Sequence, residues 1–240
     1  MNFRYWKAYF TLNRSHFQDV DWSLPGRLTE NEKKLIRSSL QQFQKGEQSE
    51  GKHFYSFAKS FPDPLYAEVI RLFIMEEQTH ARVLGKFMDQ EGIPRISGHW
   101  VDHIFRWLRK LTDLENTVMV LITAEIIAKV YYKALREATG SPLLQRLCDQ
   151  ILMDEDQHIL FQSWTLGLFF SQKNGLKKFL TRGWHRILMT GTMVIVWIQH
   201  GRVLRAGGYS FSSFLVNTWQ VFLECDKQVR GLQLRGAVYA

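Results

Sequence analysis

The chain has 240 residues, of which 45% are hydrophobic and 22% are charged, and this composition excludes a disordered or low-complexity protein. Its two cysteines are too few for a disulfide framework or a four-cysteine metal site, and they indicate a reducing, cytoplasmic setting. The net charge of +8 would allow a nucleic-acid partner, but the sequence carries no nucleic-acid-binding motif, so we expect none.

Apolar residues recur every three to four positions along most of the chain, and this period predicts helices. After an N-terminal arm over 1–29, we expect helices at about 30–60, 64–91, 112–138, 141–171, 175–205 and 210–230. Short joins carrying "FPDP" and "TGSP" predict two antiparallel hairpins, and the roughly twenty residues between them are enough to cross the bundle. The sequence therefore predicts an all-α fold: a four-helix bundle over 30–171 and two further helices within 172–240.

Two of these helices carry the same phrase, "EEQTH" at 76–80 and "DEDQH" at 154–158. In each, a glutamate precedes a histidine by three residues, so both side chains lie on one face of the helix. A carboxylate beside an imidazole suits iron, manganese or zinc. Each phrase is thus a candidate half of a metal site.

A single glutamate stands 30 residues before the glutamate of each phrase, and the two sets repeat at a constant offset of 78 residues. In an antiparallel hairpin, residues 30 apart lie at similar depth on either side of the turn. The spacing predicts that both hairpins deliver ligands to one layer of the bundle. The six candidate metal ligands are Glu47, Glu77, His80, Glu125, Glu155 and His158.

Two neighbours of these ligands leave alternatives open. Glu50 lies three residues after Glu47 and could reach the same site, but its counterpart at the repeat offset is Ala128, which cannot bind a metal. We therefore take Glu47 as the ligand and Glu50 as an adjacent acid. Tyr132 could be a redox group close to the metals, although aromatic residues at helical spacing more often form the core.

The sequence resembles the ferritin-like di-iron carboxylate superfamily over about residues 30–170, in which two helices give one glutamate each and two give Glu-x-x-His. The stretches "KGEQSEGKHFYSFA" (45–58) and "EEQTHARVLGKFM" (76–88) resemble the first two bundle helices of rubrerythrins. "AEIIAKVYYKAL" (124–135) repeats the first pattern, and "MDEDQH" (153–158) resembles a phrase of the di-iron subunit of class I ribonucleotide reductases.

This resemblance implies two bridging carboxylates, two terminal carboxylates and one imidazole for each of two iron ions, with manganese as an alternative metal. In that order the residues are Glu77 and Glu155, Glu47 and Glu125, and His80 and His158. A ligating imidazole usually donates its other N–H to an acid. The resemblance assigns this role to Asp154 for His80 and to Glu76 for His158.

Three functions are compatible with such a centre. We favour a homodimeric oxidase or oxygenase that reduces dioxygen and oxidises an organic, apolar substrate, because the Phe-, Trp- and Met-rich C-terminal helices could enclose a substrate channel. The electron donor is not specified by the sequence. A peroxide reductase or ferroxidase is the alternative, although the chain has too few cysteines for a rubredoxin-type domain.

The third function is a metal-stabilised interaction protein at a membrane surface. Basic residues in 177–186 precede the longest apolar run, which covers 187–198. At twelve residues the run is too short to span a bilayer, which takes about 20. We therefore expect a buried helix there, with peripheral membrane contact as the competing interpretation.

Overall fold

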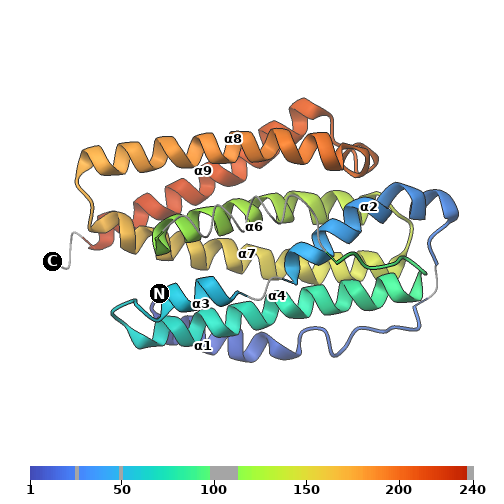
Figure 1. Cartoon of the computed structure of the whole chain (residues 1–240), viewed down its shortest axis with the longest axis horizontal. Helices are drawn as coiled ribbons and strands as arrows, with labels where there is room; N and C mark the ends of the chain where they lie inside the picture. The colour runs from blue at the N-terminus through green and yellow to red at the C-terminus, as the bar shows by residue number, and fades with distance from the viewer. Residues whose placement is uncertain (25–26, 49–50, 98–112, 237–240) are drawn as a thin grey trace.

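The computed structural model describes residues 1–24, 27–48, 51–97 and 113–236, and the regular structure of these residues is helical. Four helices form the central bundle: α2 (Glu30–Glu47), α4 (Pro64–Gln90), α6 (Leu114–Glu137) and α7 (Pro142–Ser171). α4 and α6 run in the same direction, so the end of one and the start of the other lie at opposite ends of the bundle (Figure 1). The predicted ferritin-like bundle of two hairpins is confirmed.

Each of the two short joins ends at a residue that caps the start of the next helix. Asp63 and Ser141 accept hydrogen bonds from backbone N–H groups of the first turns of α4 and α7, and a proline follows each of them. Proline is well suited to the first helical position, because an N–H group there would have no acceptor within the helix. The capping residues thus fix where each ligand-bearing helix begins.

The helix expected over 30–60 is instead two helices, and this prediction was wrong. α2 ends at Glu47, and a short helix, α3, covers Lys52–Ala58. Gly51 lies between them with a φ of 59°, and a Cβ at this position would collide with the side chain of Ile74. Only glycine adopts this backbone without strain and also fits the space. The adjacent acid Glu50 lies outside the described residues.

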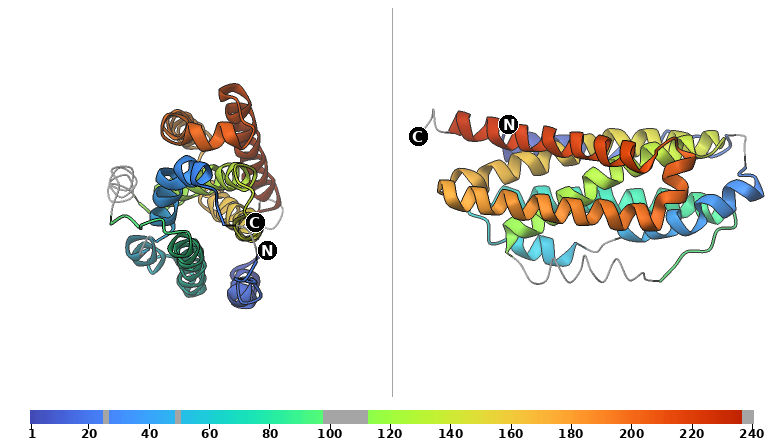
Figure 2. Two further views of the ribbon diagram at one scale, coloured as in Figure 1. Left: turned by 90° about the vertical axis from the view of Figure 1, so that its right-hand side faces the viewer. Right: turned by 90° about the horizontal axis from the view of Figure 1, so that it is seen from above.

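The N-terminal arm is also helical. α1 (Phe3–Leu12) and the 3₁₀ turn η1 (Asn13–Ser15) lie along α4 at one side of the bundle (Figures 1 and 2). Trp6 and Phe10 are buried and contact Phe161 of α7. Burying each aromatic side chain contributes about 1.5–3 kcal/mol, so the arm is part of the core.

α8 (Gly175–Ala206) and α9 (Phe211–Gly236) cover α6 and α7 on the side opposite α1 (Figure 2). The helix expected to be buried over 187–198 belongs to α8, but only one of its faces is buried. Met189 and Met193 lie in the core, whereas Ile187 and Ile198 are exposed. α8 is also long and apolar enough, by length and composition alone, to cross a membrane; of the described helices, no other qualifies.

Candidate metal centre

The six candidate ligands come together in the middle of the bundle. Glu47 is the last residue of α2, and the others lie in the interior of α4, α6 and α7. They form two groups in which one ligand atom from each residue lies within 4.8 Å of all the others. The groups are Glu47, Glu77, His80 and Glu155, and Glu77, Glu125, Glu155 and His158. Glu77 and Glu155 belong to both groups, which is the arrangement of two bridging carboxylates.

Each imidazole turns its Nδ1 atom toward the carboxylates. The Nδ1 of His158 lies 3.0 Å from Glu77 Oε1, 3.6 Å from Glu125 Oε2 and 3.8 Å from Glu155 Oε2. The Nδ1 of His80 lies 3.6 Å from Glu77 Oε1 and 3.9 Å from both Glu155 Oε1 and Glu47 Oε2. One nitrogen and several carboxylate oxygens therefore face each of two neighbouring positions.

The atoms that converge there lack hydrogen-bond partners. Buried atoms without one include Oε1 of Glu77, both carboxylate oxygens of Glu155, and Nδ1 of His80 and of His158. A buried polar atom left unpaired costs about 1–3 kcal/mol, and native proteins rarely tolerate several in one place. A pair of divalent cations would satisfy all of these atoms, so the residues present fit a two-metal centre.

The opposite nitrogen of each imidazole contacts an acid. His80 Nε2 lies 3.0 Å from Asp154 Oδ2, and His158 Nε2 lies 3.1 Å from Glu76 Oε2. Burial would raise the pKa of Asp154, but the hydrogen bond and charge of His80, together with the hydrogen bond from Asn13, outweigh burial and lower this pKa to about 2. An ionised carboxylate can only accept, so Nε2 of His80 is the nitrogen that carries the proton. Its Nδ1 then keeps the lone pair needed to bind a metal.

The N-terminal segment adds residues that the sequence analysis missed. The side-chain amide of Asn13 donates hydrogen bonds to both acids that contact the imidazoles, Glu76 and, at 3.0 Å, Asp154. His16 Nδ1 lies 3.2 Å from Asp154, which also accepts from Gln150 at 3.1 Å. No local motif marks Asn13, because its partners lie 63 and 141 residues away in the sequence.

Glu47 and Glu125 each accept a hydrogen bond from a neighbouring side chain. The hydroxyl of Tyr132 donates to Glu47 Oε1 at 2.6 Å, and the side-chain amide of Gln162 donates to Glu125 Oε1 at 2.9 Å. Tyr132 therefore contacts a candidate ligand directly. Gln162 was not predicted, although its position four residues after His158 places it on the same face of α7.

Crowded acids shift one another's proton affinity in this centre. Burial, reinforced by Glu77, raises the pKa of Glu47 well above its usual value, and burial together with Glu125 does the same for Glu155. Burial would raise the pKa of Glu77, but His158 lowers it. Burial would also lower the pKa of His158, but Glu77 and the other acids hold it well above its usual value. Cations in this site would release these trapped protons.

Other reactive side chains lie elsewhere. Burial raises the pKa of Cys148 and of Cys225, the latter to about 12, so both thiols are poor nucleophiles. His185 Nε2 lies 3.1 Å from the Thr123 hydroxyl, and burial lowers its pKa to about 4. These side chains are structural.

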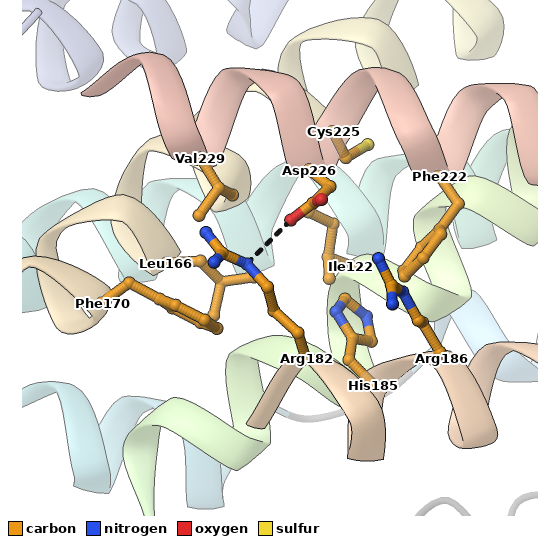
Figure 3. A pocket seen from close by; sticks show the side chains of 10 residues that line it. All are labelled: Ile122, Leu166, Phe170, Arg182, His185, Arg186, Phe222, Cys225, Asp226 and Val229. Carbon is orange, nitrogen blue, oxygen red and sulfur yellow. Dashed lines mark hydrogen bonds and ion pairs between the residues drawn. The ribbon is translucent and has the colours of Figure 1, made fainter. Parts of the chain in front are cut away.

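A hollow of about 200 Å³ opens beside the centre, between η1 and α4. Glu76 and Asn13 line it together with apolar and basic side chains, among them Phe10, Phe17, Met75, Arg14 and Arg82. Another hollow, between α8, α9 and the bundle, measures about 20 Å³ (Figure 3), which is room for about one water molecule. The C-terminal helices therefore enclose no substrate channel at this hollow.

Comparison with known proteins places the bundle in one family. The family model described as Rubrerythrin matches residues 40–166, which is more than half of the chain and includes all six candidate ligands. No curated protein matches the chain. No solved structure matches it either.

Proposed function

The chain belongs to the rubrerythrin family, and we propose that it is a non-haem di-iron oxidoreductase that reduces dioxygen and oxidises a small organic substrate. The observation that carries the proposal is the pair of ligand groups sharing Glu77 and Glu155, whose metal-facing atoms are buried and unpaired. Iron is the metal implied by the family, and carboxylate and imidazole ligands would also accept manganese. A reduced metal pair would supply the electrons for the reduction of the oxidant.

The protein's own residues would orient the metals and control access to them. Asp154 and Glu76 fix the two imidazoles, and Tyr132 and Gln162 fix the terminal carboxylates of Glu47 and Glu125. The side chain of Glu77 keeps 18% of its surface exposed, whereas Glu155 is fully buried. A small oxidant would therefore approach from the α4 side of the centre.

The hollow beside Glu76 is the candidate substrate site. Its volume of about 200 Å³ is below the roughly 300 Å³ at which drug-sized ligand pockets begin, so the substrate would be small. Phe10, Phe17 and Met75 give it an apolar wall, while Arg14 and Arg82 would favour a negatively charged group. A substrate in this hollow would contact Glu76, which is itself hydrogen-bonded to His158.

A peroxide reductase is the second candidate, and a ferroxidase is a variant of it. The match to the rubrerythrin family supports this candidate. So does the partial exposure of Glu77, because peroxide, like dioxygen, needs only a narrow path. Both candidates use the same six ligands, so ligand substitutions alone do not separate them.

The test is to load the protein with ferrous iron without oxygen and then supply dioxygen or hydrogen peroxide at equal concentration. The oxidase proposal expects iron-dependent dioxygen uptake at a rate at least comparable to that of peroxide removal. Peroxide removal far faster than dioxygen uptake would replace it with the peroxide reductase. Continued oxidation of ferrous iron well beyond the bound pair would indicate a ferroxidase. Glu155→Gln serves as the inactive control for all three measurements.

A further inference from the structure

The outer face of α8 carries a continuous stripe of exposed apolar side chains. The most exposed members are Leu176, Phe179, Leu180, Ile187 and Ile198, with 69%, 72%, 60%, 67% and 75% of their surface accessible. Trp184, Val194 and Ile195 are exposed beside them. The spacing of these residues follows the helical period, so they line one side of the helix. A stripe of this length differs from the single exposed apolar residues that are common on soluble proteins.

The charged residues of α8 all have the same sign. The helix contains six lysines and arginines and no aspartate or glutamate. Lys177 and Lys178 lie at one end of the apolar stripe, and the exposed Arg202 and Arg205 lie at the other. An apolar face framed by basic residues is the composition of helices that lie in the interface of anionic lipid bilayers.

The opposite face of α8 holds the helix in one orientation. Arg182 pairs with Asp226 of α9 at 3.1 Å (Figure 3). His185 contacts the Thr123 hydroxyl of α6 at 3.1 Å, and His200 contacts Ser39 of α2 at 2.8 Å. These polar contacts with three different helices fix the rotation of α8 about its axis. The apolar stripe is thus presented outward by a rigid support.

We propose that α8 docks the protein onto an anionic lipid surface, with its apolar stripe in the headgroup region and its basic ends on lipid phosphates. The charge argues against a second copy as the occupant, because two such faces would bring the basic residues at the ends of one stripe against those of the other. The inner face argues against a spanning helix, because leaving the fold would unpair His185 and His200 in a bilayer. The inference does not depend on the proposed oxidoreductase activity.

This docking mode leaves the metal centre accessible. α8 lies on one side of the bundle and α1 on the other (Figure 2), and the hollow beside Glu76 lies between η1 and α4. A membrane under α8 would therefore face away from that hollow. Small water-soluble reactants would reach it from the aqueous phase.

The experiment is co-sedimentation of the full chain with vesicles of phosphatidylcholine, with and without phosphatidylglycerol. We expect binding that is much stronger to the vesicles containing phosphatidylglycerol and that weakens with added salt. Leu180→Glu/Ile187→Glu should reduce this binding about tenfold or more, because two side chains no longer enter the lipid. Leu12→Glu is the matched control: Leu12 is 78% exposed on α1, and its substitution should leave binding unchanged.

Unchanged helicity by circular dichroism shows that each variant is folded. Arg202→Gln/Arg205→Gln should lower the preference for phosphatidylglycerol while keeping residual binding. Wild-type protein that ignores both vesicle types would overturn the proposal, as would binding that the Leu180→Glu/Ile187→Glu variant retains. A dimer that this variant dissociates, without vesicle binding, would assign the face to a second copy. Wild-type protein that only detergent extracts from vesicles would show insertion across the bilayer instead.

Discussion

The two halves of the metal centre carry the same sequence phrase but lie in different surroundings. In the first half, α2 ends at its candidate ligand Glu47, the helix is interrupted near Gly51, and Glu77 remains partly exposed. In the second half, α6 continues for three turns beyond Glu125, and Glu155 is fully buried. The comparison shows that the repeated spacing places equivalent ligands, whereas the flanking segments decide which half meets solvent.

The largest expected effect concerns Glu77 and Glu155, the carboxylates that belong to both ligand groups. Glu155→Gln removes a bridging charge and should reduce the iron content from two ions per chain to nearly none, as measured by elemental analysis of protein loaded with ferrous iron. Glu47→Gln changes a terminal ligand of one group only, so it should retain about one ion. A Glu155→Gln protein that still holds two irons would break the assignment of Glu155 as a bridge.

In metal-free protein, the raised pKa values of the clustered side chains should make the stability depend on pH. Glu47, Glu155 and His158 have pKa values raised in the folded state. The stability that such groups contribute is full below their unfolded pKa values and is lost as the pH rises through the folded ones. The melting temperature of metal-free protein should therefore fall, by about 5–10 °C between about pH 5.5 and 8.

Iron-loaded protein should lose this slope, because bound metal keeps the ligands deprotonated. Scanning calorimetry with and without a chelator measures both curves. Glu155→Gln should flatten the curve of the metal-free protein. A metal-free melting temperature that rises across this range would contradict the predicted proton trapping.

Removing the hydrogen-bond donor of Glu47 or of Glu125 should affect one metal position at a time. Tyr132→Phe removes the bond to Glu47, and Gln162→Leu removes the bond to Glu125. Each should weaken one metal position by about 10–100-fold, a usual cost of removing a partner of a ligand. Competition titration with a chelator should show two unequal sites in each variant. Equal weakening of both sites would show that the halves do not act independently.

The smallest effect tests the break after α2. Gly51→Ala places a Cβ against Ile74 in a left-handed backbone conformation and should lower the free energy of unfolding by about 1 kcal/mol or more. Gly46→Ala, in the last turn of α2 with no atom near the added Cβ, should raise it by at most about 0.5–1 kcal/mol. Urea denaturation measures both. A neutral Gly51→Ala would show that the break tolerates another backbone conformation.

Local periodicity and spacing predicted the bundle, its hairpins and the common depth of the six candidate ligands, because these depend on residues within one helix or one hairpin. The break after Glu47 escaped prediction because Gly51 is dictated by Ile74, a contact between helices. The role of Asn13 escaped for the same reason. The burial of the 187–198 run was mispredicted because composition records how apolar a helix is, and only packing decides which faces are covered.

Asn13 has a consequence for how the centre is assembled. A single amide holds Glu76, the partner of His158, and Asp154, the partner of His80. Asn13, at the start of η1 directly after α1, therefore sets the orientation of both imidazoles together. A truncation or fusion that displaces Asn13 would weaken the binding of both metals at once. Changes within the first thirteen residues would therefore alter the whole candidate centre.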